Sequence, residues 1–206
     1  EALLRSSDPT LGNPGAILDA AAKLGRLHEL GRAVRAGAAA HPPPDGSWLF
    51  VNLHSADLND EELYSLEAPL GRLANRVVLE ITERASLEDV ADLEKRVARL
   101  RHMGYRIAVD DLGAGYAGLT SFNQLAPEVA KIDMSLIRDI HLQPRKQAIV
   151  RSLQTLCSEL GIMVVVEGVE TPLERATLTE LGCDVLQGYL FARPGRPFPE
   201  VSWQHG

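Results

Sequence analysis

The stretch from residue 104 to residue 133, GYRIAVDDLGAGYAGLTSFNQLAPEVAKID, holds two short apolar runs with a helical pattern between them. Ile107–Val109 and Val129–Ile132 are predicted to be buried strands, because they are short and rich in Val and Ile. Tyr116–Leu125 carries apolar side chains at helical spacing. A strand, a helix and a strand in this order predict two parallel strands joined by a crossover helix.

The same alternation extends over the rest of the chain. Each of three predicted helices ends in a step such as Met103-Gly104, Leu160-Gly161 or Leu181-Gly182, where glycine suits a C-cap before the next strand. The pattern predicts a parallel α/β fold in a single domain over residues 1–206. The other predicted strands are Ala2–Leu4, Trp48–Leu53, Val77–Ile81, Ile162–Val166 and Val185–Leu190, and the other predicted helices are Ala16–Ala39, Asp60–Ala74, Leu87–Met103, Arg145–Leu160 and Pro172–Leu181.

Composition excludes several classes of protein. With 21 Lys and Arg against 28 Asp and Glu among 206 residues, the net charge of −7 argues against binding of a nucleic acid polymer. No apolar run reaches the length of a membrane span, and no signal peptide is recognisable. Cys157 and Cys183 are too few for a disulfide framework, so we expect a reducing compartment and a packing role for both. The chain begins at Glu1 without methionine, and we expect it to be a piece of a longer protein.

Polar side chains follow nearly every predicted strand. In a parallel α/β barrel the carboxyl ends of the strands meet at one face, so we expect these side chains to converge. Several carboxylates packed together need cations, and oxygen ligands select Mg²⁺ or Mn²⁺. Taken singly, each acid is better explained as a solvated residue at the end of a strand, but five of them in register make that explanation poor. The residues are Asn52, Glu80, Glu83, Asp110, Asp111, Lys131, Asp133, Glu167, Glu170 and Gln187, with Glu1 at the start of the chain.

Seven short motifs, in the same order, resemble the signatures of the EAL-domain cyclic-di-GMP phosphodiesterase family. Each is weak alone, but together they cover nearly the whole chain. They are Glu1-Ala2-Leu3-Leu4-Arg5, Val51-Asn52-Leu53, Leu79-Glu80-Ile81-Thr82-Glu83, Asp110-Asp111-Leu112-Gly113-Ala114-Gly115-Tyr116, Lys131-Ile132-Asp133, Glu167-Gly168-Val169-Glu170 and Gln187-Gly188-Tyr189.

The resemblance implies an α/β fold, a TIM-like barrel of EAL type, whose first, antiparallel strand precedes Glu1 and is missing from this chain. It implies hydrolysis of cyclic-di-GMP to linear pGpG by water activated between two Mg²⁺ or Mn²⁺ ions, with Ca²⁺ inhibitory. One ion would be held by Glu1, Asn52, Glu80 and Asp110, and the other by Asp110, Asp111 and Glu167, with Asp110 bridging the two.

Roles for the remaining motif residues follow from the same resemblance. Lys131 would orient the attacking water, Gln187 would help to place it, and Arg5 would contact substrate. Glu83, Glu170 and Asp133 would support the ligands from outside the metal shell. The resemblance also implies a homodimer through helices near the loop Asp110–Tyr116, an upstream sensor or regulatory domain, and a bacterial cytoplasmic location. Leu112 replaces the usual Phe, and Ala117-Gly118 replaces Ser-Ser, which affects the packing of this loop but no ligand.

Three other interpretations compete with a cyclic-di-GMP hydrolase. Residues Gly113–Gly118 fit a dinucleotide-binding pattern, but Asp110 and Asp111 would then lie beside the pyrophosphate, which makes this interpretation poor. A catalytically silent EAL module could bind cyclic-di-GMP as a receptor or serve as a dimerisation platform. Two-metal chemistry does not itself choose the substrate, so a different phosphodiester is the third alternative.

Overall fold

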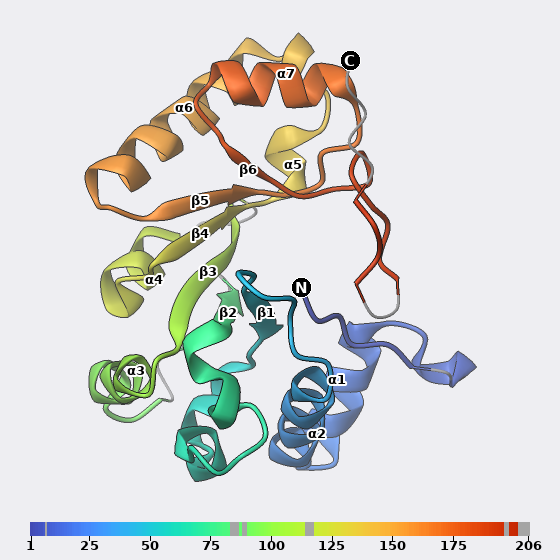
Figure 1. Cartoon of the computed structure of the whole chain (residues 1–206), viewed down its shortest axis with the longest axis vertical. Helices are drawn as coiled ribbons and strands as arrows, with labels where there is room; N and C mark the ends of the chain where they lie inside the picture. The colour runs from blue at the N-terminus through green and yellow to red at the C-terminus, as the bar shows by residue number, and fades with distance from the viewer. Residues whose placement is uncertain (7, 83–86, 88–89, 114–117, 196–197, 202–206) are drawn as a thin grey trace. The chain divides into compact units, whose positions relative to one another are not determined.

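The computed structural model describes residues 1–6, 8–82, 87, 90–113, 118–195 and 198–201, with strands and helices alternating along the chain (Figure 1). The chain divides into two compact units: Glu1–Ile81 with Ala85–Ile107, and Thr82–Arg84 with Ala108–Gly206.

The elements in chain order, with η for 3-10 helices, are η1 (Pro9–Leu11), α1 (Pro14–Lys23), α2 (Leu27–Ala39), β1 (Leu49–Asn52), η2 (Ser55–Asn59), η3 (Glu61–Tyr64), η4 (Gly71–Arg76), β2 (Val77–Thr82), α3 (Leu93–His102), β3 (Arg106–Leu112), α4 (Gly118–Leu125), β4 (Val129–Ile132), α5 (Met134–Ile137), η5 (Ile140–Leu142), α6 (Pro144–Glu159), β5 (Met163–Val166), α7 (Pro172–Glu180) and β6 (Val185–Leu186).

In the first unit, β1 pairs with β2 in parallel, with Asn52 opposite Glu80 at the end of the ladder. Five of the six residues of β2 are buried, as expected for a strand that is covered on both faces. The predicted strand Ala2–Leu4 is reduced to one bridge, between Ala2 and Val51. The prediction of a strand there was wrong because a ladder needs consecutive pairs.

One helix predicted over Ala16–Ala39 is in fact two, α1 and α2. The break lies at Gly25, whose φ of +66° is in the left-handed region that glycine adopts without strain. The N–H of Arg26 donates to the carbonyl of Ala21 at 2.8 Å and so closes the end of α1. The apolar spacing continued through Leu24-Gly25, and the prediction therefore missed a C-cap.

The helix predicted over Asp60–Ala74 is also wrong, because this segment contains the 3-10 helices η3 and η4. Asp60 accepts a hydrogen bond from the N–H of Glu62 at 3.1 Å and caps η3 rather than lying inside a longer helix. Pro69, which has no N–H to donate, precedes η4. Local capping therefore divides the segment into short turns.

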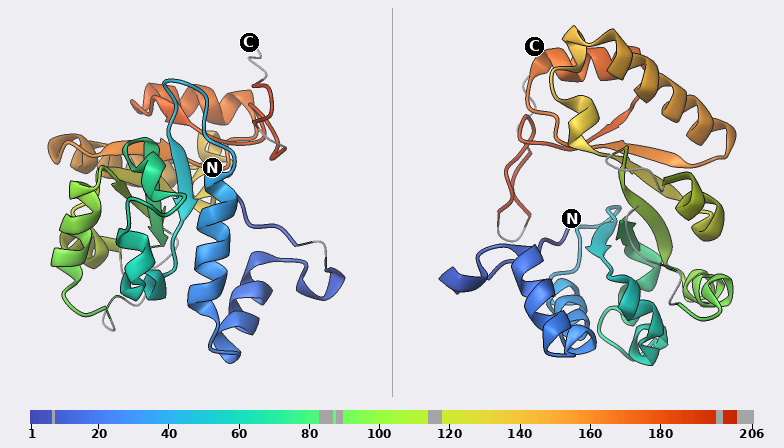
Figure 2. Two further views of the ribbon diagram at one scale, coloured as in Figure 1. Left: turned by 60° about the horizontal axis from the view of Figure 1, so that its bottom comes forward. Right: turned by 180° about the vertical axis from the view of Figure 1, so that it is seen from behind.

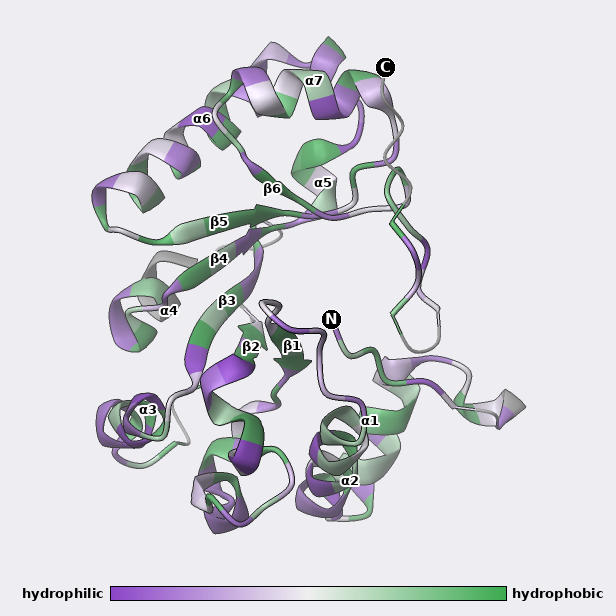
Figure 3. Cartoon of the chain, in the orientation of Figure 1, coloured by the Kyte–Doolittle hydropathy of each residue, from purple (hydrophilic) through white to green (hydrophobic). Residues whose placement is uncertain are grey.

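In the second unit, β3 to β6 pair in parallel in chain order. All four residues of β4 are buried, and Figure 3 shows the apolar character of β3, β4 and β5. Helices α6 and α7 lie along the same side of β5 and β6 in Figure 1 and in the right view of Figure 2. The strand β6 is shorter than predicted, because from Gln187 onward the chain hydrogen-bonds to Val169, in the loop after β5.

Glycine ends the predicted helices as expected. Gly104, Gly161 and Gly182 have φ values of +104°, +70° and +82°, which confirms the three C-caps. The bounds of α6 and α7 match the prediction within one residue. Helix α3 begins later than predicted, at Leu93. The predicted start of the next helix, Tyr116, lies outside the described residues.

Both cysteines are buried and free, as their predicted packing role requires. Burial raises the pKa of each thiol to about 11, so both are protonated at neutral pH. Within the described ranges, no helix combines the length and the apolar character that crossing a bilayer would need.

Candidate functional site

Asp110 and Asp111 lie at the end of β3, where its pairing with β4 is irregular. The register shifts between Val109 and Leu112, so that two residues of β3 face one residue of β4, Lys131. Asp111 has a φ of 60°, a left-handed conformation that aspartate tolerates better than most residues. Neighbouring side chains of a regular strand point to opposite faces, and this bulge removes that alternation. Two consecutive carboxylates can therefore serve one site.

Glu167 brings a third carboxylate to the same place from the end of β5. Its backbone N–H donates to the carbonyl of Ile132 at 3.1 Å, which continues the β4–β5 pairing beyond the strand. One oxygen atom from each of Asp110, Asp111 and Glu167 lies within 4.8 Å of the others, and Asp110 is buried. Oxygen ligands at this spacing suit a hard divalent cation such as Mg²⁺ or Mn²⁺. The sequence predicted this convergence.

Lys131 lies between two of these acids. Its Nζ atom is 2.6 Å from Oε1 of Glu167 and 3.4 Å from Oδ1 of Asp110, and its side chain is 1% exposed. A buried ammonium is costly unless carboxylates surround it, as they do here. Lys131 contributes one positive charge, whereas the three carboxylates carry up to three negative charges. The cluster is therefore suited to a divalent cation in addition to the lysine.

A second group of predicted ligands lies in the first unit. Asn52, at the end of β1, donates from Nδ2 to Oε1 of Glu1 at 2.8 Å. Glu80 is fully buried in β2, opposite Asn52 in the ladder. Glu1 thus contacts Asn52, and Glu80 is the ladder partner of Asn52. Their role as metal ligands stays a prediction. The bridging role of Asp110 between two ions stays a prediction.

The supporting residues have varied surroundings. Gln187 is exposed directly after β6, and its N–H donates to the carbonyl of Val166 at 2.8 Å. Arg5 is exposed and donates to the carbonyl of Leu4. Their predicted roles toward water and substrate stay predictions.

Two of the predicted supporting acids have defined partners in the loops of the second unit. Asp133 accepts from the N–H of Ser135 at 2.9 Å and caps α5. Glu170 forms a two-point ion pair with Arg138, at 2.7 and 2.8 Å. Glu83 lies outside the described residues.

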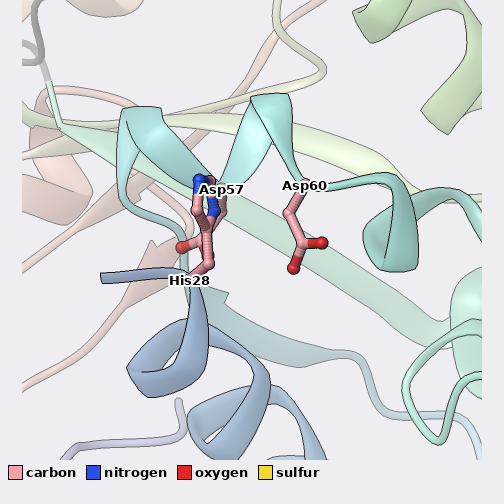
Figure 4. A group of neighbouring side chains, drawn as sticks. All are labelled: His28, Asp57 and Asp60. Atoms are coloured by element: carbon pink, nitrogen blue, oxygen red, sulfur yellow. The ribbon is translucent and has the colours of Figure 1, made fainter. Parts of the chain in front are cut away.

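Sequence reasoning missed another acidic group with metal-like spacing, formed by His28, Asp57 and Asp60 (Figure 4). Arg35 donates to Asp57 at 2.7 Å and to Asp60 at 2.6 Å, and Arg32 donates to both oxygens of Asp60. These arginines compensate the charge of the aspartates, and we assign the group a structural role. Ion pairs between residues 22 to 28 positions apart leave no local signal in the sequence.

Comparisons with known proteins agree on one family. The EAL domain model matches residues 1–194, across both units. The cyclic di-GMP phosphodiesterase RocR of Pseudomonas aeruginosa is 36% identical over 169 residues, which span 82% of this chain and 41% of RocR. The solved calcium and cyclic-di-GMP complex of BlrP1 from Klebsiella pneumoniae matches 97% of this chain and 52% of BlrP1, with 35% identity and a TM-score of 0.82.

A manganese and cyclic-di-GMP complex of BlrP1 matches 93% of this chain and 50% of BlrP1, with 34% identity and a TM-score of 0.77. The fold class predicted from the sequence, a TIM-like α/β barrel of EAL type, is confirmed by these matches. The chain spans less than half the length of RocR and about half the length of BlrP1.

Proposed function

Because this chain belongs to the EAL domain family, we propose that it is a metal-dependent phosphodiesterase that hydrolyses cyclic di-GMP to linear pGpG. The convergence of Asp110, Asp111 and Glu167 around Lys131 carries the proposal. Hydrolysis of a phosphodiester needs a nucleophilic water and neutralisation of phosphate charge, and carboxylates that hold divalent ions provide for both. The choice of substrate is supported by the similarity to the cyclic di-GMP phosphodiesterase RocR and to BlrP1, which was solved in complex with cyclic di-GMP.

The donor set fits Mg²⁺ or Mn²⁺, because it consists of carboxylate and amide oxygens without sulfur. Asp110, Asp111 and Glu167 would hold one ion, and Glu1, Asn52 and Glu80 would provide ligands for another. When bound, such ions polarise the phosphodiester and lower the pKa of a bound water. We expect Ca²⁺ to support binding of the substrate but not its hydrolysis, because Ca²⁺ makes longer bonds in looser geometry.

Lys131 is the residue of this site that can direct the water. Its ammonium group has three N–H donors and no acceptor, so a bound water accepts a hydrogen bond from Lys131 through a lone pair and does not donate a proton to it. Asp110 and Glu167 fix the position of Nζ. The water oxygen would form the new bond to phosphorus as the bond from phosphorus to the 3′ oxygen breaks. The water would lose one proton and the 3′ oxygen would gain one, and the phosphate would remain on the 5′ side of the linear product. Lys131 would thereby set the direction of attack.

The proposal is tested by incubating the metal-stripped chain with cyclic di-GMP and adding Mg²⁺, Mn²⁺ or Ca²⁺ in parallel, with linear pGpG measured by chromatography. We expect product with Mg²⁺ or Mn²⁺ and none with Ca²⁺ or EDTA. Binding is measured separately in Ca²⁺ by calorimetry. Full activity of the metal-free chain in EDTA would contradict the metal requirement.

The same experiment separates the alternative functions. Binding of cyclic di-GMP in all metals without formation of product would favour a receptor. Hydrolysis of another phosphodiester in preference to cyclic di-GMP would show that the substrate is different. A homodimer, an upstream sensor domain and a cytoplasmic location stay predictions, and light scattering with and without substrate measures the first of these.

A further inference from the structure

The short helix α5, which follows β4, packs against two glycines. Gly168 has a φ of +70°, and a Cβ atom there would lie 2.4 Å from Cβ of Met134. Gly113 has a φ of +100°, and a Cβ atom there would lie 2.4 Å from Cδ1 of Leu136. Side chains two positions apart on α5 therefore occupy the space next to both glycines. A larger residue at Gly168 would displace the backbone of α5, and one at Gly113 would displace the Leu136 side chain.

Both glycines belong to loops that carry metal ligands. Gly168 directly follows Glu167, and Gly113 comes two residues after Asp111. The position of α5 is therefore coupled by packing to the backbone that presents these carboxylates. A shift of α5 would change the distance between Glu167 and Asp111.

The C-terminal end of α5 is tied to the β5–α7 loop by Glu174, a fully buried acid at the start of α7. Its Oε1 atom accepts from the N–H of Asp139 at 3.0 Å. Its Oε2 atom accepts from the N–H groups of Glu170 and Thr171, at 2.9 and 3.0 Å. Burial favours a raised pKa for Glu174, but the three backbone donors together lower it, so the carboxylate is charged at neutral pH.

Arg138 reinforces the same connection from the surface. Its guanidinium group forms the two-point ion pair with Glu170, and its carbonyl accepts from Nζ of Lys146 at 2.8 Å. At the other end of α5, the N–H of Asp133 donates to the carbonyl of Leu112 in β3 at 3.2 Å. The helix is thus held at both ends, to β3 and to the β5–α7 loop.

We propose that Glu174 is a positioning residue for the metal ligands, and that it acts through α5 on the loops of Glu167 and Asp111. It touches neither metal nor substrate. The bond from Asp139 ties the end of α5 to Glu174, and the bonds from Glu170 and Thr171 tie Glu174 to the β5–α7 loop. The packing of Met134 and Leu136 transmits the position of α5 to Gly168 and Gly113. The proposal rests on the proposed function in one respect, the binding of a divalent ion by these carboxylates.

The test is the affinity for Mn²⁺ alone, measured by calorimetry on the metal-stripped chain, followed by the Mn²⁺ dependence of hydrolysis. For Glu174→Ala we expect Mn²⁺ affinity to fall about tenfold, because residues that orient metal ligands affect affinity on this scale. Glu174→Gln keeps the two bonds from Glu170 and Thr171 but presents an amide N–H₂ to Asp139, so we expect a fall of about threefold. Excess Mn²⁺ should restore part of the rate for both.

Two matched variants test whether the effect depends on the hydrogen bond between Asp139 and Glu174 that connects α5 to α7. Thr171→Ala removes the side chain that accepts from the N–H of Glu174 at 3.2 Å, and with it the cap of α7, but leaves the Glu174 carboxylate in place. Glu180→Gln changes an exposed acid of the same helix. We expect both to bind Mn²⁺ like the unaltered chain.

The outcomes separate the two claims. If the unaltered chain does not bind Mn²⁺, the metal site of the proposed function is wrong. If it binds and Glu174→Ala binds equally well, or if Thr171→Ala weakens binding as much, the positioning role is wrong. Should Glu174→Ala fail to fold, Arg138→Ala replaces it, since this side chain is about one-third exposed. Unchanged Mn²⁺ affinity in Arg138→Ala together with Glu174→Gln would then overturn the proposal.

Discussion

Among the residues that the structure describes, each unit contains one acidic group with the spacing of a metal site, but the cations around the two groups differ. In the first unit, Asp57 and Asp60 are met by two arginines, Arg32 and Arg35, through short hydrogen bonds. In the second unit, Lys131 lies between two of the three carboxylates and forms ion pairs with them. Spacing alone would therefore assign a metal to both, whereas charge balance favours the second.

The backbone around the arginine-paired group supports this distinction. A Cβ atom on Gly31 would lie 1.9 Å from Oδ1 of Asp57, so the Asp57 carboxylate occupies the space beside Gly31 of α2. The hydrogen bond from Arg32 is the main cause that lowers the pKa of Asp60, and Arg35 adds to it. Asp60 is therefore charged and paired at neutral pH. The comparison teaches that a buried acid whose charge is already balanced holds the fold together rather than binding an ion.

Asp110→Asn is expected to have the largest effect. It removes one charge from the cluster in the second unit, and we expect turnover and Mn²⁺ affinity each to fall about a hundredfold or more, beyond the loss typical of residues outside the metal shell. Asp60→Asn provides the comparison, and it should leave Mn²⁺ affinity unchanged in protein that remains folded. Calorimetry with Mn²⁺ on both variants measures the difference. Equal losses would mean that both groups bind metal.

Asp60→Ala should instead lower the stability of the fold without directly weakening the binding of metal. Arg35 has a side chain that is 5% exposed and would lose one of its two carboxylates, so we expect unfolding to become easier by about 3 kcal/mol. Urea denaturation measures the change. Glu67→Ala, which removes an exposed ion pair with Arg72, should cost under about 0.5 kcal/mol. A similar small loss in both variants would show that the buried network is not important for stability.

Lys131→Ala tests whether the lysine in the second group has a chemical role beyond balancing charge. We expect kcat to fall about a hundredfold, as for loss of a group that positions a reactant, while the substrate Kd measured in Ca²⁺ changes less than about threefold. Lys95→Ala, at a lysine that is 80% exposed, is the control and should change neither quantity. Parallel losses of rate and affinity would rule out a water-directing role.

Part of the fold was predictable because its signals are local. β4, α6 and α7 follow from apolar spacing, and their neighbouring glycines mark where helices end. Breaks inside continuous apolar patterns were missed, as at Gly25, because the spacing does not record a change in φ. The four-residue helix α5 was also missed, since it is too short to show a helical period and its end is held by a bond from Asp139 to Glu174, 35 positions along the chain.

For the site, the sequence predicted which residues lie at the ends of strands. It did not predict that two consecutive side chains of one strand contribute to the same site. That Asp110 and Asp111 contribute to one cluster depends on the bulge opposite Lys131, a feature of pairing between strands. The arginine-paired group was missed for a similar reason. Arg35 is one of two arginines on the amphipathic helix α2, and it is buried against Asp57 of η2 and Asp60, the cap of η3.

The last and smallest expected effect is in the pH dependence of stability, and it concerns the first unit. Asp60 has a lowered pKa in the folded chain, so its contribution to stability is present above its unfolded pKa and is lost as the pH falls below that value. Burial, opposed by Arg35, raises the pKa of Asp57, so the contribution of this group has the opposite sign and is lost as the pH rises. The two aspartates therefore partly cancel in the unaltered chain.

Asp60→Asn separates these contributions. With an unfolded pKa near 3.9, the stabilisation from Asp60 should decrease by about 1 kcal/mol between pH 6 and pH 3, and the variant should lack this decrease. Urea unfolding at pH 3, 4, 5 and 6 measures the free energy of both proteins. Their difference should be greatest at pH 6 and shrink toward pH 3, because in the unaltered chain the unfolded state takes up a proton at Asp60 before the folded state does. A difference that stays constant over this range would show that the arginines do not hold Asp60 in its charged form, and the contrast between the two acidic groups would then lose its electrostatic basis.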